Sequence, residues 1–527
     1  MRLGLFDTAV LIAYLFIVAL IGFIAGRREK KTARGYFLAG SRLPWYAIGL
    51  SMVASSISTE QFIGEVGFAY SHGLAVANWE WAVFPALTVF LWILVPLYIR
   101  GRITTMPEYL ERRFGVGVRT IFAVLTIISY AIVNMALVLY SGGLALNHIF
   151  NIPFMWCVVL LAAVTGAYTI YGGLSSVVWT DAFQCALLLL GGLFIFVRGL
   201  WAVDGGLTAI LAGGDRAHLI LPADHPELPW TAMLTLATST CIWYYGTNQY
   251  INQRVLGAKN EWHAQMGVVF CGFLGVFLAL AVSFPGMIAY AMDPLLEDPD
   301  TAYPYLVLRL VPKSLQGLLL AALLGAIMST ISSLLNSTAT VYTIDIHQRF
   351  IRPNASHAQL IRAGRFAALI TMLVGVACVP LTSMWKHIFA YCQEVWVLMA
   401  GPVVAVFLVG AFWKEATNAA AITVMLLCFP LITLPYLQRT FPFLPGPFAN
   451  ILVLGGLVFV ASVILMVAVS LATPARKKTG LDNTIWTKSM LVLPRETAGR
   501  RLPLVNSRVF WWVVVGLIYG AIYVYFW

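Results

Sequence analysis

The sequence predicts an all-α polytopic membrane protein with about fourteen transmembrane helices. Of its 527 residues, 60% are apolar and only 10% are charged, and the mean hydropathy is +0.85. A water-soluble domain carries about a quarter charged residues, so this chain could not cover its apolar surface in water. A lipid bilayer removes that requirement, and the membrane class is therefore predicted before any motif is considered.

Fourteen apolar stretches approach or exceed the length that a membrane-spanning helix needs, which is about 20 residues. The first stretch is long for the apolar region of a signal peptide, so we interpret it as a transmembrane helix. The predicted spans lie near residues 8–26, 45–70, 74–99, 119–147, 154–171, 175–200, 229–251, 263–291, 314–345, 362–382, 387–412, 417–437, 449–472 and 509–527.

The basic residues gather in alternate connections between these spans. If the N-terminus is outside, the inside connections hold most of the 33 Lys and Arg residues, and two outside connections, 204–227 and 293–300, are acidic. Such a bias sets the orientation of membrane proteins. We therefore expect a multi-pass protein of the cell membrane with both termini outside. The net charge of +11 belongs to this pattern and does not indicate a nucleic-acid partner.

The second predicted span contains the polar stretch 54–65, ASSISTEQFIGE. Serine and threonine side chains compete for backbone groups, so this sequence is a poor straight helix. We predict an unwound segment near Ser55–Ser58, whose free carbonyl groups could bind a cation. The alternative is a continuous helix that packs closely against its neighbours through small residues.

Polar side chains also interrupt other spans, where their burial is costly unless they have partners. In the seventh span, Gly246 lies among Tyr, Thr and Asn residues and suggests a second helix break. The ninth span offers oxygen donors without thiolates or imidazoles, a set that suits an alkali cation, although packing between helices is an equal alternative. The candidates in the remaining spans and in these two are Glu80, Asp181, Tyr244, Tyr245, Ser329, Thr330, Ser332, Ser333, Asn336, Gln393 and Glu394.

The predicted spans hold glutamates but no Lys or Arg near the middle of the membrane. An anionic solute would need a cationic partner, although a helix N-terminus could replace it. A neutral polyhydroxyl solute is therefore the better fit. We find no nucleotide-binding loop, so an ion gradient is the expected energy source rather than ATP.

Several stretches resemble the sodium:solute symporter family, in particular its sodium/glucose and sodium/galactose cotransporter branch. Their order and spacing extend through residues 36–414. The stretches are 36–45 (YFLAGSRLPW), 54–64 (ASSISTEQFIG), 105–114 (TMPEYLERRF), 171–181 (YGGLSSVVWTD), 248–254 (NQYINQR), 284–286 (FPG), 335–340 (LNSTAT) and 412–414 (FWK).

The resemblance implies a LeuT-like core of two inverted five-helix repeats, with broken helices at the first position of each repeat. In this chain, residues 1–43 would form an N-terminal flanking helix and a basic cytoplasmic loop. Residues 44–200 would form the first repeat and residues 201–412 the second. Residues 413–527 would form three C-terminal flanking helices with a basic cytoplasmic loop at 473–508.

The resemblance also implies two kinds of site. The family's sodium site uses carbonyl groups of the first core helix and hydroxyl groups of the eighth, which correspond here to Ala54, Ile57, Ala326, Ser329 and Thr330. The sugar site corresponds to Gln61, Glu80 and Gln393, with Tyr244 as the inner gating aromatic residue; Ser58 and Glu60, beside Gln61, complete the candidate substrate-binding set.

Some positions depart from the family pattern. Cys241, Gly275 and Ser56 stand where sugar-transporting members carry Asn, Lys and Asn, which makes the usual pose of galactose or glucose doubtful. Conversely, Asp181, Ser332 and Ser333 stand where some members bind a second sodium ion. A different sugar, a polyol such as inositol, or another solute stays open, and so does coupling to two sodium ions.

These observations predict a sodium-coupled secondary active symporter that imports a small neutral polar solute, a sugar or polyol, by alternating access. Its expected partners are the solute, Na⁺ and the lipid bilayer, with Na⁺ as coupling ion and no other cofactor; the sequence does not indicate the oligomeric state. One alternative is a sodium- or proton-coupled symporter of an amino acid or organic acid. An intramembrane enzyme or a sensor is a further alternative, but no paired His, metal-ligand spacing or nucleophile accompanies Glu60, Glu80 and Asp181.

Overall fold

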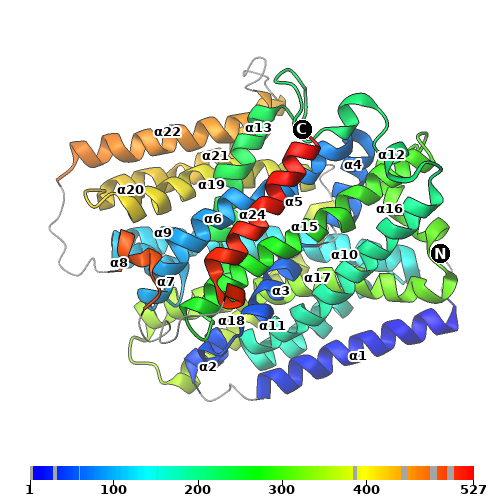
Figure 1. The fold of residues 1–527 in the computed structure, drawn as a ribbon. Coiled ribbons are helices and arrows are strands. Elements are labelled where there is room, and N and C mark those ends of the chain that lie inside the picture. Colours follow the sequence, from blue (N-terminus) through cyan, green and yellow to red (C-terminus); the bar gives the residue numbers. More distant parts are fainter. Residues whose placement is uncertain are drawn as a thin grey trace.

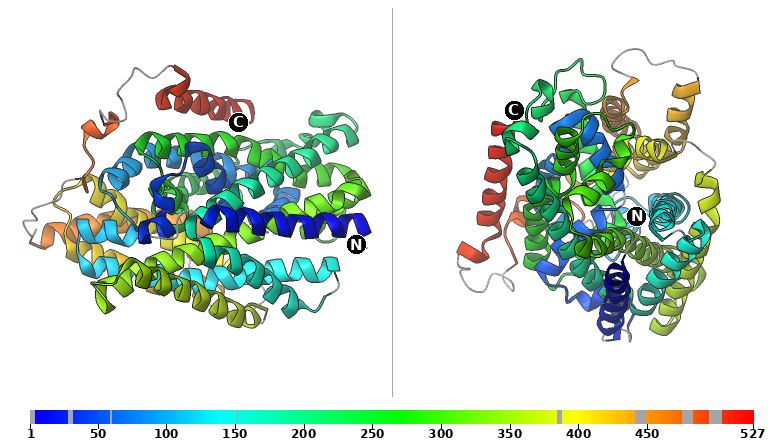
Figure 2. Two further views of the ribbon diagram at one scale, coloured as in Figure 1. Left: turned by 90° about the horizontal axis from the view of Figure 1, so that it is seen from below. Right: turned by 90° about the vertical axis from the view of Figure 1, so that its right-hand side faces the viewer.

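A computed structural model of the chain describes residues 4–27, 32–58, 60–150, 152–383, 388–440, 449–474, 483–494 and 504–527. The described residues are almost entirely helical, with two isolated β-bridges as their only strand-like pairing. Most of the long helices run side by side in one bundle (Figures 1 and 2). Eleven described helices are long and apolar enough to cross a membrane.

The first half of the chain contains α1 (Leu5–Arg27), α2 (Ala33–Leu38), α3 (Trp45–Ser56), α4 (Val66–His72), α5 (Asn78–Trp81), α6 (Val83–Val89), α7 (Val95–Arg100), α8 (Met106–Arg113), α9 (Val116–Ile128), α10 (Met135–Phe150), α11 (Phe154–Ala202) and α12 (Gly206–Ile210). The second half contains α13 (Trp230–Thr235), α14 (Gln249–Leu256), α15 (Glu261–Met292), α16 (Ala302–Leu310), α17 (Lys313–Val341), α18 (His357–Ser383), α19 (Ile388–Phe412), α20 (Asn418–Leu426), α21 (Cys428–Thr440), α22 (Ile451–Ala472) and α24 (Arg508–Tyr525).

The second predicted span is interrupted, as its sequence suggested. Helix α3 ends at Ser56, and Ile57 has the extended backbone angles φ −111° and ψ 128°. A wider π-helical segment, Glu60–Glu65, then leads into α4. The predicted unwinding is therefore confirmed at Ile57 and Ser58, whereas Ser55 and Ser56 remain in the last turn of α3.

The seventh predicted span is also interrupted, but two residues later than Gly246. The π-helical segment Trp243–Thr247 includes Gly246, and Asn248 is the residue with extended angles, φ −76° and ψ 127°. The side chain of Asn252 donates hydrogen bonds to the carbonyl oxygens of Asn248 (2.8 Å) and Tyr245 (3.0 Å). The break lies where a side-chain amide can satisfy the freed carbonyl groups.

The count of fourteen separate spans differs from the eleven uninterrupted helices. The second and seventh spans are broken helices, and the fifth and sixth are joined in α11, which changes direction at Gly173. Gly173 has a φ of 63°, and a Cβ atom there would lie 2.3 Å from the carbonyl oxygen of Tyr36. Only glycine accommodates both the left-handed backbone and the close approach of α2.

Helix α17 lies at the centre of the bundle. Every residue from Leu319 to Val341 is buried, and the helix packs against α1, α11 and α18. A helix without an exposed face needs no hydrophilic stripe, so its hydroxyl-bearing residues must find partners inside the protein. This position brings Ser329 to Ser333 next to the break in α3.

The two ends of the bundle differ in charge. One end carries the basic connections, including an ion pair between Arg100 and Glu261 at 2.8 Å. The opposite end carries the acidic connections together with both described terminal segments. There the backbone N–H of Gly317 donates to Asp7 at 2.8 Å, and that of Leu219 donates to the carbonyl of Phe526 at 2.8 Å. Both ends of the chain are thus on the acidic side.

We expect Gly26→Val to lower the unfolding temperature of the purified protein, because α1 and α11 touch through their backbones. A Cβ atom at Gly26 would lie 2.4 Å from the Cα atom of Gly172. Overpacking of this kind costs about 1–3 kcal/mol. Gly520→Val is the matched control, since a Cβ atom there has no heavy atom within 4 Å. Equal unfolding temperatures for the two variants in detergent would contradict the packing of α1 on α11.

Candidate functional site

A cavity of about 1290 Å³ lies between the two interrupted helices and reaches the acidic end of the bundle. Its mouth is formed by the segments 223–229 and 449–452 together with Asp300. Partial burial raises the pKa of the Asp300 carboxyl group, and the nearby charge of Asp298 adds to this effect. The mouth therefore lies in the acidic connections, on the side that carries both termini.

Besides Tyr245 and Glu394, six of the residues selected from the sequence line this cavity. Ser58, Gln61 and Glu80 come from the first broken helix and the helix after it, whereas Tyr244, Thr330 and Gln393 come from the second half of the chain. The side-chain carbonyl of Gln61 accepts a hydrogen bond from the backbone N–H of Ser58 at 2.7 Å. Gln61 therefore caps the unwound segment and faces the cavity at the same time. The side chain of Glu60 lies outside the described residues.

Tyr244 forms the floor of the cavity. Its hydroxyl donates to the carbonyl oxygen of Ser55 at 3.3 Å, and its ring contacts those of Tyr245 and Tyr250 at centroid distances of 5.2 and 5.8 Å. This contact joins the two broken helices just where both lose their regular winding. The cavity thus opens toward the acidic end and is closed toward the basic end.

A second layer of contacts lies below this floor. The hydroxyl of Tyr130 donates to the side chain of Asn248 and accepts from the backbone N–H of Gln249 at 3.1 Å. The side chain of Gln249 in turn accepts from the backbone N–H of Met106 at 2.8 Å. The helix after the second break is therefore tied to α8 and to the π-helical segment Ser129–Asn134.

The five predicted sodium ligands lie together beside the break in α3. Ser329 donates to the carbonyl oxygens of Ala54 and Ala326, each at 2.8 Å. Thr330 donates to the carbonyl of Ile57 at 3.3 Å and to that of Ala326 at 3.1 Å. Three carbonyl and two hydroxyl oxygens thus converge in a buried space, and this all-oxygen set fits an alkali cation.

Asp181 is paired with a residue that the sequence placed elsewhere. We predicted Arg254 in a cytoplasmic connection, but its side chain is 1% exposed and lies 3.0 Å from the fully buried Asp181 carboxylate. Arg254 also donates to Ser51 at 2.6 Å and contacts Ser55 and Ser333. The error has a physical cause: the break at Asn248 turns α14 back into the bundle, so its last turn stays inside the protein.

The candidate second sodium site is therefore already engaged with a protein cation. Ser333 bonds to Arg254, whereas Ser332 donates to the carbonyl of Ser329 at 2.9 Å. The second oxygen of Asp181 has no hydrogen-bond partner among the described residues, and nearby α11 carries other such buried oxygens: those of Thr165, Tyr168, Thr169 and Gln184. A cation or water molecule there would have unused acceptors available.

Some cavity residues were not selected from the sequence. Glu65 lines the wall and accepts a hydrogen bond from Ser283 of α15 at 2.7 Å. Asn134 enters from the π-helical segment before α10. Glu65 belongs to the polar stretch 54–65 and could have been selected, whereas nothing in the sequence near Asn134 signals that it faces the cavity.

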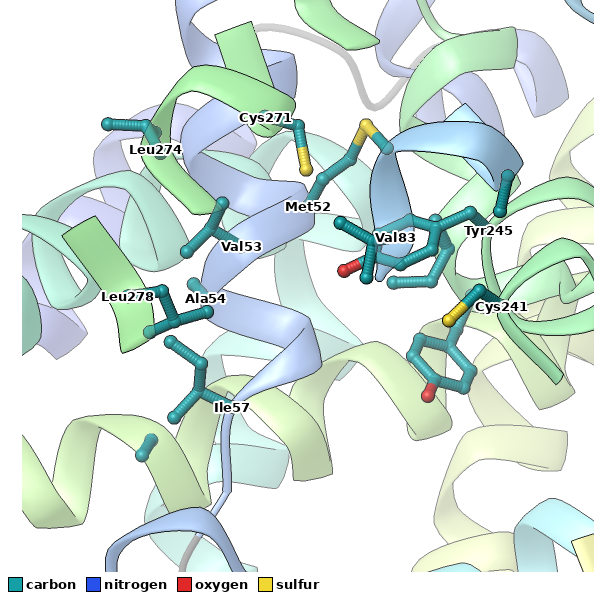
Figure 3. Close-up of a cluster of buried hydrophobic side chains, with 14 of the residues drawn as sticks. Met52, Val53, Ala54, Ile57, Val83, Cys241, Tyr245, Cys271, Leu274 and Leu278 are labelled. Carbon is teal, nitrogen blue, oxygen red and sulfur yellow. The ribbon is translucent and has the colours of Figure 1, made fainter. Parts of the chain in front are cut away.

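The three departures from the family pattern have different surroundings. Cys241 and Ser56 line the cavity, whereas Gly275 does not. A Cβ atom at Gly275 would lie 2.7 Å from the hydroxyl oxygen of Tyr519, so α24 fills that space. Figure 3 shows Cys241, Tyr245 and Val83 on the side of α3 that carries Met52, with Cys271 close by. This part of the wall is apolar.

A cavity that holds polar side chains between two interrupted helices, with oxygen donors at the breaks, is typical of a secondary transporter. The sequence profile of the sodium:solute symporter family matches residues 36–428. The sodium/glucose cotransporter of Vibrio parahaemolyticus is 37% identical over 84% of this chain and 87% of its own length. The rabbit (Oryctolagus cuniculus) sodium/myo-inositol cotransporter 2 is 33% identical over 79% of this chain and 67% of its own length.

Two solved structures share the fold. A Na⁺-coupled sialic acid symporter in a substrate-bound outward-open state aligns with a TM-score of 0.77 at 23% identity, over 90% of this chain and 100% of that chain. A nucleobase-cation-symport transporter in a closed conformation aligns with a TM-score of 0.55 at 14% identity, over 85% and 98%.

The chain belongs to the sodium:solute symporter family. It has the LeuT-like fold of inverted five-helix repeats. It is a membrane-spanning, sodium-coupled symporter of a small solute rather than an enzyme, and Na⁺ is its coupling ion.

We expect Arg254→Met to destabilise the protein strongly, because it leaves Asp181 buried without its cation. Removing one partner of a buried ion pair costs about 3–5 kcal/mol. The double variant Arg254→Met with Asp181→Ala should regain part of this loss, since neither charge remains. Thermal unfolding in sodium-free detergent measures both effects.

Arg349→Met is the matched control for this experiment. Arg349 also pairs with an acidic residue, Glu111, at 2.8 Å, but its side chain is 47% exposed. Exposed pairs contribute about 0–1 kcal/mol. If Arg254→Met and Arg349→Met unfolded at the same temperature, the buried pair would not have the role assigned to it.

Proposed function

We propose that this symporter imports a small polar solute of the sugar or polyol class, driven by the sodium gradient. One observation carries the proposal: the same unwound segment serves both the oxygen cluster and the cavity. The carbonyls of Ala54 and Ile57 face Ser329 and Thr330, and Ser58 follows directly in the cavity wall. A cation bound at the cluster would therefore fix the backbone that positions the substrate-binding side chains.

We assign sodium binding to Ala54, Ile57, Ala326, Ser329 and Thr330. The convergence of these oxygens supports the assignment. Thr330 also lines the cavity, so it connects the two sites directly. Sodium binding requires the two hydroxyl protons to turn away from the carbonyls, and the cation then replaces the hydrogen bonds that join α3 to α17.

We assign solute binding to Gln61, Glu80 and Gln393, with Ser58 and Glu60 beside them and Tyr244 as the inner gate. Side-chain amides and carboxylates both exchange hydrogen bonds with hydroxyl groups, which supports a polyhydroxyl solute. The related glucose and myo-inositol cotransporters are consistent with this class. The lining includes no Lys or Arg among the described residues, which disfavours an organic acid.

The proposed cycle follows from the shape of the cavity, which is closed by Tyr244 and open at the acidic end of the bundle. Sodium binding orders the break in α3, and the solute then binds above Tyr244. Inward opening requires the Tyr244 hydroxyl to leave the carbonyl of Ser55 and the layer around Tyr130 to separate. A ligand shifts such an equilibrium only by its different affinity for the two forms. An inward-negative membrane potential adds about 2.3 kcal/mol per 100 mV to the driving force for the inward movement of each positive charge.

We propose that the acidic end with both termini faces outward in the cell membrane. The separation of basic and acidic connections at opposite ends of the bundle supports this orientation. The cavity would then face the sodium-rich side. The proposed division of the chain is a flanking segment 1–43, repeats 44–200 and 201–412, and a C-terminal segment 413–527 with a basic loop at 473–508.

We also propose a second sodium site at Asp181, Ser332 and Ser333. The unpaired Asp181 oxygen supports it, and the Arg254 guanidinium would have to move aside or share the carboxylate. Coupling to two ions predicts a charge-to-solute ratio of two in proteoliposomes with an imposed potential. A ratio of one, together with a sodium Hill coefficient of one, would reject the second site.

We expect Ser329→Ala and Gln61→Ala to impair uptake in different ways. Loss of the Ser329 hydroxyl removes one of the five proposed sodium ligands. If sodium binding weakens by about 1.5 kcal/mol, the sodium concentration needed for half-maximal uptake rises roughly tenfold. Gln61→Ala should instead weaken solute affinity and change selectivity, with a smaller effect on the sodium requirement. Uptake of labelled glucose and myo-inositol into proteoliposomes, measured over a range of sodium concentrations, separates the two.

The control for this comparison is Ser462→Ala. Ser462 of α22 is also buried and also donates to a helix carbonyl, that of Val458 at 2.7 Å, but it does not line the cavity. The Ser462→Ala variant should keep the sodium requirement and the solute affinity near those of the unaltered protein. If Ser329→Ala and Gln61→Ala shifted sodium and solute dependence equally, the assignment of separate sites would be wrong.

A further inference from the structure

Acidic side chains follow the cavity from its mouth to mid-depth. Asp224, Glu227 and Asp300 lie at the mouth, and Glu65, Glu80 and Glu394 lie deeper. Within the described lining, no Lys or Arg accompanies them. A wall of one charge sign raises the local concentration of the opposite sign. The cavity therefore attracts cations along its whole length, beyond what a neutral solute needs.

Glu80 is the most informative of these residues. It is 7% exposed, its carboxylate reaches the cavity wall, and no described residue donates a hydrogen bond to it. Glu65 lines the same cavity, and Ser283 donates to only one of the two Glu65 oxygens. Two neighbouring carboxylates with so little compensation are costly in a membrane protein.

Among the described residues that line the cavity, no Lys or Arg supplies a positive charge. Cys241 and Tyr245 line the same cavity as Glu80, and the hydroxyl of Tyr519 lies beside Gly275, near the backbone of Glu80. The hydroxyl hydrogen of Tyr519 is already donated to the carbonyl of Gly272 at 2.9 Å. None of these groups carries a positive charge.

The two arginines nearest to the ends of the cavity are also engaged. Arg254 is held by Asp181 below the floor. Arg216 donates to the carbonyls of Tyr70 and Ser71, each at 2.7 Å, and lies over the ring of Tyr290. The sodium cluster beside α17 is built from carbonyl and hydroxyl oxygens, so a sodium ion bound there does not neutralise Glu80 by contact. A cationic group on the ligand would supply the compensating charge.

We propose that the transported solute carries a positively charged amino group, which Glu80 and Glu65 bind together. The solute class is an amino sugar or amino polyol, so the inference rests on the proposed function and narrows its substrate. An ammonium group has three donors and no acceptor, which suits two carboxylates on one side of a cavity. The remaining hydroxyl groups of the solute face Gln61 and Gln393. N-acetylation of the amino group removes its positive charge, so an N-acetylated solute should lose the gain in affinity.

The test compares sugars that differ only in this group. The purified protein is titrated calorimetrically, with and without sodium, with glucose and with its 2-amino, 3-amino and 6-amino deoxy derivatives. Myo-inositol and an aminodeoxyinositol form a second pair, and N-acetylglucosamine is the uncharged counterpart of the 2-amino sugar. The variants are Glu80→Gln and Glu65→Gln, which keep the shape and remove the charge. Glu297→Gln is the control, an exposed acid in an outer loop that does not line the cavity.

We expect at least one amine to bind about tenfold tighter than its neutral parent, a difference of about 1.4 kcal/mol. Glu80→Gln should abolish this preference, Glu65→Gln should reduce it, and Glu297→Gln should preserve it. The proposal is overturned if no amine exceeds its parent, or if the preference survives in both Glu80→Gln and Glu65→Gln.

Three further outcomes distinguish a failure of this inference from a failure of the proposed function. If neutral sugars bind more tightly with sodium and no amine is preferred, the proposed function stands and the amino-group inference fails. A binding of glucose that strengthens on acidification, and loses this dependence in Glu80→Gln, would mean that a proton occupies the pair, which also overturns it. If no sugar or polyol binds with or without sodium, both proposals fall.

Discussion

The structure depends on one constraint, the need to satisfy backbone groups where two membrane helices lose their winding. A free carbonyl in a bilayer is costly, so a break persists only where the protein supplies partners. At Ala54 and Ile57 those partners are the hydroxyls of Ser329 and Thr330 on the buried part of helix α17. At Asn248 and Tyr245 the partner is the side-chain amide of Asn252. These freed carbonyls destabilise the fold when they lack partners, and they are also the groups that a cation can bind.

The buried charges follow a related logic. Asp181 of α11 and Arg254 of α14 meet in the core, where neither would be stable alone. Ser51, Ser55 and Ser333 surround the pair and join α3 to α17. The pair therefore lies between the first broken helix and the central helix. The Glu80 carboxylate has no ion-pair partner among the described residues, which distinguishes it from the paired carboxylate of Asp181.

The substrate cavity and the oxygen cluster are neighbours because one short segment contributes to both. The residues after the break in α3 turn their side chains toward the cavity, while the carbonyls before it face α17. Tyr244 connects this segment to the second broken helix and closes the floor. A movement at either break would therefore shift groups of the oxygen cluster, of the cavity wall and of the inner gate.

Much of this site could be predicted from sequence because it is encoded locally. The serine-rich stretch predicted the break in the second span, and the hydroxyl residues of the ninth span predicted an oxygen-rich helix. The seventh span was predicted less accurately, since the break fell at Asn248 rather than at Gly246. Glycine allows a break, but the position of a break is set by the side chain that can satisfy the carbonyls. Here that side chain is Asn252, and the sequence pattern does not identify it.

By itself the sequence determined the membrane class, the spans and the polar residues within them, because hydropathy and helix propensity are properties of short stretches. The tertiary structure alone decided which distant groups meet. From the sequence, Arg254 is predicted to lie in a connection between helices, but the fold turns α14 inward toward Asp181. Glu65 and Glu80 are separate acidic residues in the sequence, and the fold places both in the wall of one cavity. Such pairings depend on how helices pack in three dimensions, and no local pattern records them.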